Sequence, residues 1–434
     1  MAGPVADDQS LGEGPSRASA YGWAVFALSF GLLISDYMAR QVLNAVFPLL
    51  KAEWHLSDSK LGLLTGIVAV MVGVLTLPLS LAADRWGRVR SLTLMAILWS
   101  LATLLCAAAG GYAEMLVGRA LVGVGEAAYG SVGIAVVISV FPRRMRATLS
   151  AMFLAGGIFG QVLGVAIGAQ IAAIHGWRVA FTVIGVMGLV LGVAYPLVVR
   201  EKRIKALSNA ADAPPRIEQK ASIRELISSR SVRLAYLGNG LQYFAAGALP
   251  SWLPSYLNRY YAMPVDKAGR LAGLLLLVCG TGMILCGVVS DRLSRGDPGR
   301  KITLAITFCL GSAAALTVAL QLPPGPGQLV MLAVAMAMVA GTSGPAGAMV
   351  ANLTPLALHG TAFATMTLAN NFLGLAPGPI LTGRVADSVG LLDAFRLLPV
   401  PCLLAALSFY AMRSSYRTDL ARLSSQSTAA SSEA

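Results

Sequence analysis

Charged residues are scarce in this chain. Only 12% of its 434 residues are Asp, Glu, Lys or Arg, and 56% are hydrophobic, whereas soluble domains carry about 25% charged residues. A water-soluble fold of this composition would expose large apolar patches. The shortage of charge therefore excludes an ordinary soluble domain and indicates that lipid surrounds the protein, in agreement with a mean hydropathy of +0.71.

The sequence also lacks the motifs of several chemistries. Its five cysteines lie in apolar runs without the histidines of a metal site, so we expect no metal and no cofactor. There is no Gly-x-x-x-x-Gly-Lys-Ser/Thr stretch and no soluble segment large enough for an ATPase. Without a nucleophile or metal constellation the chain is not expected to be an enzyme, and any energy source must be a gradient.

Basic residues outnumber acidic ones by 33 to 20, which gives a formal net charge of +13. They lie almost entirely between apolar runs, as do the charges that orient membrane helices, so nucleic acid is not expected as a partner. The polar stretch 1–20 begins without a basic region and is interpreted as a disordered cytoplasmic tail.

Twelve apolar windows are long enough to cross a bilayer, which takes about 20 residues. The pattern predicts an all-α membrane protein with twelve transmembrane helices. In order, the predicted spans are Tyr21–Phe47, Leu61–Ala83, Ser91–Ala109, Met115–Val140, Ala147–Ile174, Arg178–Val199, Leu234–Leu257, Ala268–Val289, Ile302–Leu320, Gln328–Leu353, Thr361–Ala386 and Leu391–Met412.

Positive charge marks alternate turns between these spans. The basic turns after spans 2, 4 and 8 carry Arg85, Arg88 and Arg90, then Arg143, Arg144 and Arg146, then Arg292, Arg295, Arg300 and Lys301. Because Lys and Arg beside membrane helices stay in the cytoplasm, we expect a multi-pass protein of the inner membrane with both termini cytoplasmic. The turn between spans 10 and 11 is marked only by His359.

A long polar segment divides the spans into six plus six. The predicted organisation is a tail at 1–20, a six-helix half at 21–199, a cytoplasmic linker at 200–231, a second half at 232–412 and a cytoplasmic tail at 413–434. Two motifs recur in the same order in both halves. The end of span 2, Ser80 to Arg88, resembles the end of span 8, Gly287 to Arg295, and Gly176 to Phe181 resembles Gly390 to Phe395.

With this repeat, the chain resembles the major facilitator superfamily over all twelve spans. The turn Asp84-Arg85-x-Gly87-Arg88 is similar to that family's signature between helices 2 and 3, although Ser80 stands where a Gly is usual. Arg119 followed by Gly123, Gly125 and Glu126 resembles its fourth-helix signature. The resemblance implies two pseudo-symmetric halves, transport of a small molecule and a monomeric protein.

Two branches of the superfamily are similar in detail, the spinster-like transporters and the anion:cation symporters. Both tend to carry Tyr-x-Asp-Arg in helix 1, where this chain has Tyr37 and Arg40 but Ala39 in place of the Asp. The helix-4 pattern from Arg119 to Glu126 is intact, and Trp252-x-Pro254-x-Tyr256-Leu257 fits both branches. The departure at Ala39 puts the helix-1 carboxylate of these families in doubt.

Charges inside a bilayer cost about 2.5–3.5 kcal/mol each, so those that remain are candidates for function. Asp36 and Arg40 are one helical turn apart on the same face as Ala39, so Asp36 could supply the missing carboxylate. The alternative is a neutralised pair that merely allows helix 1 to insert. An Arg at this depth is suited to binding a carboxylate in two-pronged fashion.

Helix 4 carries a polar stripe, because Arg119, Gly123, Glu126 and Gly130 share one face. No histidine lies deep in a predicted span, so a proton carrier must be a carboxylate. Glu126 is the first candidate and Asp36 the second. Arg119 is expected nearer the outer end of the helix and is assigned to gating.

Neutral polar side chains would complete a binding path with Arg40 and Tyr37. For each one alone, an interhelical hydrogen bond is as plausible as ligand contact. The candidates are Tyr129, Gln161, Asn239, Gln242, Tyr243, Asn370 and Asn371.

Glycines at 156, 160, 164 and 168 predict a close helix contact along span 5, interpreted as one between the two halves. Gly374 and Gly378 repeat the pattern on span 11.

By resemblance, the two Asp-Arg turns form a latch that closes the cytoplasmic side. Its residues would be Asp84, Arg85 and Arg88 after span 2 and Asp291 and Arg292 after span 8. The alternative is ordinary anchoring of the helix ends by positive charge.

These observations favour a proton-coupled transporter of a small organic anion, whose partners are the substrate, H⁺ and the lipid bilayer. An efflux transporter of amphipathic, lipid-like or drug-like compounds is the alternative that the spinster resemblance implies. A non-transporting membrane sensor is a third reading, which the short tails disfavour.

Overall fold

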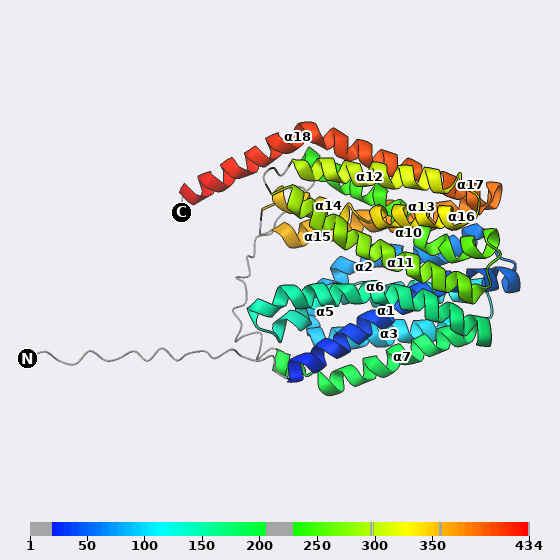
Figure 1. The fold of residues 1–434 in the computed structure, drawn as a ribbon. Coiled ribbons are helices and arrows are strands. Elements are labelled where there is room, and N and C mark those ends of the chain that lie inside the picture. Colours follow the sequence, from blue (N-terminus) through cyan, green and yellow to red (C-terminus); the bar gives the residue numbers. More distant parts are fainter. Residues whose placement is uncertain (1–19, 205–228, 296, 298, 356–357, 433–434) are drawn as a thin grey trace, which may run out of the picture.

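In a computed structural model, the first half of the chain forms a bundle of long helices (Figure 1). The structure describes residues 20–204, 229–295, 297, 299–355 and 358–432. Residues 1–19 of the predicted tail and most of the linker 200–231 lie outside these residues. The helices of the first half are α1 (Ala20–Trp54), α2 (Asp58–Trp86), α3 (Arg88–Ala108), α4 (Tyr112–Glu126), α5 (Tyr129–Ser139), α6 (Arg143–His175) and α7 (Trp177–Val198).

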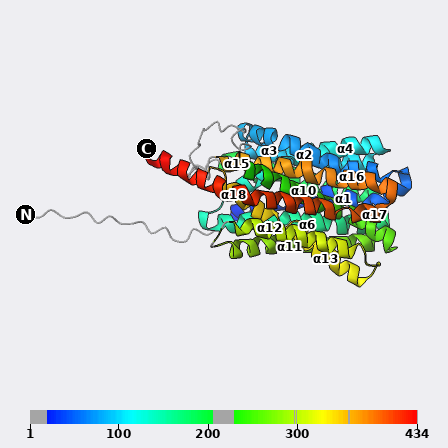
Figure 2. The ribbon, with the colours of Figure 1, turned by 90° about the horizontal axis from the view of Figure 1, so that it is seen from above.

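The second half repeats this arrangement beside the first (Figures 1 and 2). Its elements are α10 (Arg230–Tyr260), α11 (Val265–Leu293), α12 (Arg300–Ala319), α13 (Pro326–Val339), α14 (Ser343–Asn352), α15 (His359–Asn370), the π-helical turn η2 (Asn371–Leu375), α16 (Pro377–Val389), α17 (Leu391–Arg396) and α18 (Pro399–Ser432). The predicted tail at 413–434 is helical as far as Ser432, because α18 continues to that residue.

Ten helical segments of the described chain are long and apolar enough to cross a membrane. They include the joined pairs α4–α5, α13–α14 and α17–α18. The two other predicted spans are α10 and the run α15–η2–α16, which lie in the same bundle (Figure 1). Proline and buried amide side chains lower the hydropathy of α10, and η2 interrupts the other run. The all-α membrane fold in two halves is therefore confirmed.

Two tight turns show the relation between the halves. Gly176 joins α6 to α7 at φ +86°, and Gly390 joins α16 to α17 at φ +88°. Glycine is favoured at both, since other residues rarely adopt positive φ. The sequence echo around these two glycines therefore marks equivalent positions of two structural repeats.

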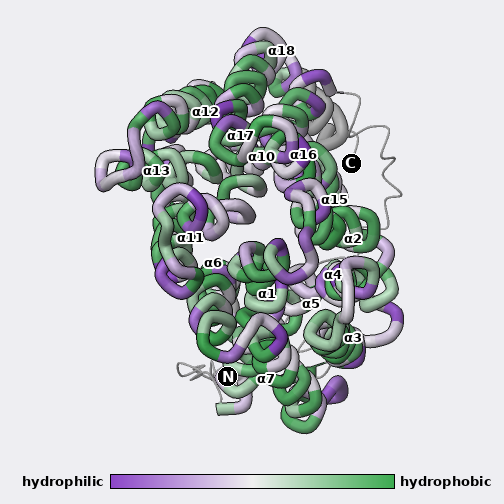
Figure 3. The backbone as a smooth tube through the Cα atoms, turned by 90° about the vertical axis from the view of Figure 1, so that its right-hand side faces the viewer, coloured by the Kyte–Doolittle hydropathy of each residue, from purple (hydrophilic) through white to green (hydrophobic). Residues whose placement is uncertain are grey.

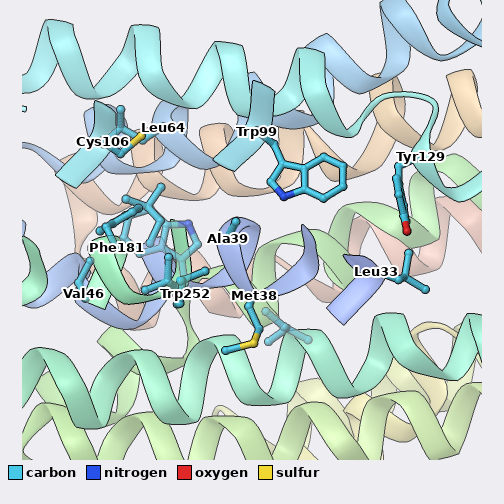
Figure 4. Close-up of a cluster of buried hydrophobic side chains, with 14 of the residues drawn as sticks. Leu33, Met38, Ala39, Val46, Leu64, Trp99, Cys106, Tyr129, Phe181 and Trp252 are labelled. Carbon is cyan, nitrogen blue, oxygen red and sulfur yellow. The ribbon is translucent and has the colours of Figure 1, made fainter. Parts of the chain in front are cut away.

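The helix termini gather at two ends of the bundle. The basic end carries the start of α1, the Gly87 turn and the start of α12, whereas the opposite end carries the turn between α1 and α2 (Figure 1). Apolar side chains fill the space between helices, with Trp99, Tyr129, Phe181 and Trp252 among the largest (Figure 4). Apolar side chains such as Leu197 and Tyr410 are exposed on the outside, as expected where lipid is the solvent.

The close helix contact along α6 is present, but its partner was predicted wrongly. A Cβ added to Gly160 would lie 2.7 Å from Ile34 O, and one added to Gly164 would lie 2.8 Å from Met38 Cα, so these glycines face α1 of the same half. Gly378 likewise faces Phe244 O of α10 within the second half. Contact between the halves instead uses glycines of α11, where a Cβ on Gly273 would meet Ala166 of α6 at 3.2 Å.

Candidate functional site

Three charged side chains from two helices meet inside the first half. Arg40 Nε of α1 lies 3.9 Å from Glu126 Oε2, at the last residue of α4. The Asp36 and Glu126 carboxyl groups are within hydrogen-bonding reach of each other. The helical spacing of Asp36 and Arg40 thus places both next to Glu126, an encounter that a single helix pattern could not predict.

The three groups differ in their access to solvent. The Arg40 side chain is 22% exposed, whereas the Glu126 side chain is only 3% exposed. Asp36 Oδ1 and Glu126 Oε1 are both buried without a hydrogen-bond partner. Buried carboxyl oxygens are costly to leave unpartnered, so this arrangement is suited to taking up a proton or a ligand. The partly exposed Arg40 side chain is the part of the cluster most open to an incoming anion.

Arg119 lies in the interior of the first half and not at an outer surface. It is 0% exposed and donates three hydrogen bonds, to Ala39 O at 2.9 Å, Arg40 O at 3.0 Å and Leu64 O at 3.4 Å. The guanidinium therefore joins α4 to α1 and α2, and it holds the backbone that carries Arg40. This contact pattern makes Arg119 a positioning residue for the charged cluster.

Helix 4 is interrupted directly after Glu126. The α4 helix ends there and α5 begins at Tyr129, which frees the Ala127 carbonyl from its helical partner. Thr76 Oγ1 of α2 donates to that carbonyl at 2.7 Å. Backbone breaks at membrane depth occur where they line a site or are satisfied by neighbours, so the break draws attention to the Glu126 position.

The second half is interrupted at the corresponding helix. The α13 helix ends at Val339 and α14 begins at Ser343, and Gln242 Nε2 of α10 donates to Val339 O at 3.1 Å. Interrupted helices at matching positions of two repeats point to a binding site in transporters. The sequence signal was the glycine richness of both spans, which did not by itself show where the helices break.

Polar side chains of the second half form a connected network. Asn239 donates to Asn370 Oδ1 at 2.8 Å and accepts from Thr342 Oγ1 at 2.8 Å. The Tyr243 hydroxyl lies 2.7 Å from Ser343 Oγ, beside the helix break. Candidate residues from α10 and from the end of α15 are therefore brought together with α14.

Among the side chains that the structure describes in this half, the amide oxygens of Gln242 and Asn371 are buried without a partner. Gln242 Nε2 also donates to Ser312 Oγ at 2.9 Å, and Asn371 Nδ2 donates to Thr367 O at 2.9 Å. The free oxygens are hydrogen-bond acceptors that a ligand hydroxyl could use.

The remaining candidates belong to the first half. Gln161 accepts from Gln41 Nε2 at 3.3 Å, and the half-buried Tyr37 ring lies against Gly157 of α6. Tyr129 is 0% exposed, donates to Ser29 O at 2.8 Å and packs edge-on against Trp99, as Figure 4 shows. Tyr129 is thus held within the helix packing.

The two Asp-Arg turns lie at the basic end. Asp84 falls in the last turn of α2, and its side chain lies outside what the structure describes. Arg85 and Arg292 are exposed, and Asp291 pairs with Lys301 of its own half at 3.1 Å while remaining 76% exposed. Arg88 begins α3.

A charged cluster that sequence reasoning missed joins the halves at the opposite end. Asp58, at the start of α2, accepts two hydrogen bonds from Arg259 of α10, at 2.6 and 2.7 Å, and one from Lys51 at 2.6 Å. Asp387 of α16 accepts from the backbone N–H groups of Asp58 at 2.6 Å and Ser59 at 3.0 Å. We call these residues the inter-half ion cluster; it joins α2 of the first half to α10 and α16 of the second.

The fold and this site define a polytopic membrane transporter of two repeats. A sequence model of the Major Facilitator Superfamily matches residues 28–379 and 235–429. The chain belongs to the major facilitator superfamily, whose members are membrane transporters and not enzymes.

Named relatives fall in the two branches suggested by the sequence. The chain is 27% identical over 399 residues to the probable L-galactonate transporter of Escherichia coli strain K12, covering 87% of this chain and 85% of that one. It is 27% identical over 399 residues to human protein spinster homolog 1, covering 86% and 75%. A bacterial homologue of the human lysosomal transporter spinster, solved inward-facing and unoccupied, superposes with a TM-score of 0.80 at 18% identity over 93% and 99%.

Proposed function

We propose that this chain is a proton-coupled secondary transporter of the cell inner membrane that carries a small organic anion of the carboxylate type by alternating access. The observation that supports it most is the charged cluster, in which the partly exposed Arg40 lies 3.9 Å from buried Glu126. Arg40 binds the anionic group of the substrate, and Glu126 exchanges the proton. The name of the Escherichia coli relative, a probable L-galactonate transporter, supports an organic anion as the substrate class.

Asp36 acts with Glu126 in proton binding. Their carboxyl groups are within hydrogen-bonding reach, and one proton shared between them removes their mutual repulsion. This supports the hypothesis that Asp36 supplies, from one turn away, the helix-1 carboxylate that Ala39 does not provide. An anion bound to Arg40 weakens the attraction between Arg40 and Glu126 and so favours the protonated carboxyl pair. Proton and anion then favour each other's binding, which is the requirement for symport.

Polar side chains of the second half bind the rest of the substrate. Tyr243, Asn370 and Asn371 lie at or beside interrupted helices, and Gln242 and Asn371 retain free amide oxygens. A polyhydroxylated acid would satisfy these acceptors, whereas Gln161 and Tyr37 would complete the site from the first half. The Asp-Arg turns Asp84-Arg85 and Asp291-Arg292 act in gating at the cytoplasmic end, where both termini lie, and the protein works as a monomer.

The test is uptake in proteoliposomes that contain the purified protein. A panel of labelled organic acids, sugars and amphipathic cations is offered with and without an imposed pH gradient. We expect accumulation of an acid that depends on an inward proton gradient and that disappears when a protonophore is added. Accumulation of neutral or cationic compounds alone, or uptake of an acid unaffected by pH, would contradict the proposal.

The second candidate function is efflux of an amphipathic compound, which the resemblance to spinster-like transporters favours. The chain is as similar to human protein spinster homolog 1 as to the galactonate transporter, at 27% identity. In that case Arg40 would serve gating and not substrate binding. Export of an amphipathic compound from loaded vesicles, without uptake of the same compound from outside, would identify this activity.

A further inference from the structure

A separate cavity lies at the basic end of the second half, away from the charged cluster. It has a volume of about 340 Å³ and lies where the start of α12 meets α18. Its polar lining comprises Asp297, Arg300, Thr303, Arg413, Tyr416 and Arg417. A volume in this range is enough for a small ligand or a headgroup.

The charge of the lining is positive. Three arginines face one carboxylate, and Asp297 pairs with Arg417 at 3.6 Å, so the charges of Arg300 and Arg413 are not balanced within the cavity. Arg300 Nη1 makes a long hydrogen bond of 3.4 Å to Leu293 O, which does not neutralise it. Guanidinium groups match the oxygens of a phosphate in two-pronged fashion. The cavity therefore fits a phosphate-bearing anion.

The helix surfaces beside the cavity are exposed and apolar, which suits a lipid better than an aqueous solute. The α12 and α18 helices lie at the outer edge of the bundle (Figure 3). Along α18, Leu407, Tyr410, Arg413 and Arg417 follow one another at helical spacing on one face, and the first two are 61% and 62% exposed. An exposed apolar stripe thus leads through a tyrosine, the residue type of the membrane interface, to the arginines.

The α12 helix presents a matching face. Leu310 is 46% exposed and lies on the same side as Thr303, two turns further along the helix from the cavity. We propose that this cavity binds the phosphate headgroup of an anionic phospholipid from the leaflet at the basic end, with its acyl chains along the exposed apolar faces of α12 and α18. Basic pockets between membrane helices are suited to such headgroups.

The test compares three forms of the full-length protein after delipidation in detergent. They are the parent, the double variant Arg300→Gln/Arg413→Gln, and the charge-matched control Arg90→Gln/Lys202→Gln, whose two positions are exposed in α3 and just after α7. Binding of phosphatidylglycerol and of phosphatidylcholine is measured by native mass spectrometry. The double variant leaves the Asp297–Arg417 pair intact, so no uncompensated acid is created.

We expect one phosphatidylglycerol molecule on the parent and on the control, bound in preference to phosphatidylcholine. Each interfacial arginine contributes about 1 kcal/mol, so the double variant should bind phosphatidylglycerol roughly thirtyfold more weakly. The single variant Arg413→Gln, at an exposed position, should weaken phosphatidylglycerol binding about fivefold. It replaces the double variant in the test if the double variant does not fold.

Equal phosphatidylglycerol binding by the parent and either cavity variant would overturn the proposal. A second arm adds inorganic phosphate at millimolar concentration and follows the unfolding temperature. If phosphate stabilises the parent but not the double variant, while phosphatidylglycerol binds all forms equally, the ligand is a free phosphate and the lipid assignment is wrong. Neither arm depends on transport, so its outcome is independent of the proposed function.

Discussion

Glu126 combines deep burial with two charged neighbours, and its role in coupling can be tested by removing only its ability to ionise. The Glu126→Gln variant resembles the permanently protonated form. It should exchange labelled substrate in counterflow at a rate similar to the parent, because the anion still meets Arg40. It should fail to accumulate substrate under a pH gradient, because no proton is released. The measurement is counterflow beside pH-driven uptake in the same vesicles.

The control for this variant is Glu114→Gln, which changes an exposed carboxylate in the first turn of the same helix. The control should retain both activities. Retained pH-driven accumulation in Glu126→Gln would remove this residue as the carrier and make Asp36 the next to test.

The prediction for Arg40 concerns the affinity of the transporter for its acid substrate. If it binds a carboxylate with two hydrogen bonds, Arg40→Lys keeps the charge but offers a single point of contact. Loss of one charge-assisted hydrogen bond, worth about 1.5–3 kcal/mol, should raise the KM for the acid by about 10- to 100-fold. Initial uptake rates over a range of substrate concentrations give this value.

The matched change is Arg178→Lys, because Arg178 also pairs with a carboxylate, Glu53, at 2.7 Å, but at the opposite end of the bundle. Its KM should stay within about twofold of the parent, as expected for a largely exposed pair. A normal KM in Arg40→Ala, together with transport of a neutral or cationic compound, would favour the efflux function.

At the scale of elements, the inter-half ion cluster joins α2 to α10 and α16. Asp58 is 3% exposed and shares its carboxylate between Arg259 and Lys51, so removing its charge leaves these two partly exposed cations without their shared carboxylate. We expect the cluster to stabilise a state that is closed at the opposite end. Asp58→Asn should therefore shift the population towards a state that is open there.

Ser255 provides the readout for this shift. It is 0% exposed on α10, one turn before Arg259 and on the face that also carries Trp252, whose ring contacts Phe47 of the first half. In a background without the native cysteines, a thiol at Ser255→Cys should react slowly with a maleimide in the parent and at least several-fold faster with Asp58→Asn. The control Asp266→Asn, in an exposed pair with Arg270 at the same end, should not change the rate. An unchanged rate in Asp58→Asn would show that the cluster does not hold this end closed.

The elements themselves were largely predictable from the sequence, because a bilayer demands apolar runs of a certain length and leaves deep charges conspicuous. Asp36, Arg40 and Glu126 were found in this way. Their meeting was not predictable, since it depends on how α1 and α4 pack. The helix breaks after Glu126 and Val339 were missed because the apolar run continues through them. The Asp58–Arg259 contact spans 201 residues, and each partner alone resembles an ordinary helix-end charge.

At the scale of the whole molecule, the orientation in the membrane follows from the distribution of basic residues. The Gly87 turn and the starts of α6, α12 and α1 lie at one end, and that end carries Arg85, Arg90, Arg146 and Lys301. Positive charge near short loops is retained in the cytoplasm, so the basic end should be cytoplasmic. Because an even number of spans separates the termini, both must lie on that side.

A reporter fused after Ala434 tests this orientation together with the span count. Alkaline phosphatase, which is active only in the periplasm, should be inactive there, and a fluorescent protein that folds in the cytoplasm should be bright. The same reporters fused after His175, in a truncated chain, should behave in the reverse way, because the turn between α6 and α7 lies at the opposite end. The predicted pattern depends on α10 and the interrupted run α15–η2–α16 both crossing the membrane, although neither is among the ten segments apolar enough by composition alone. If only one of them crossed, the C-terminal phosphatase would be active. If neither crossed, the fusion after Tyr260 would lose its periplasmic activity while the fusion after Gly390 would keep it, and the six-plus-six arrangement would be wrong.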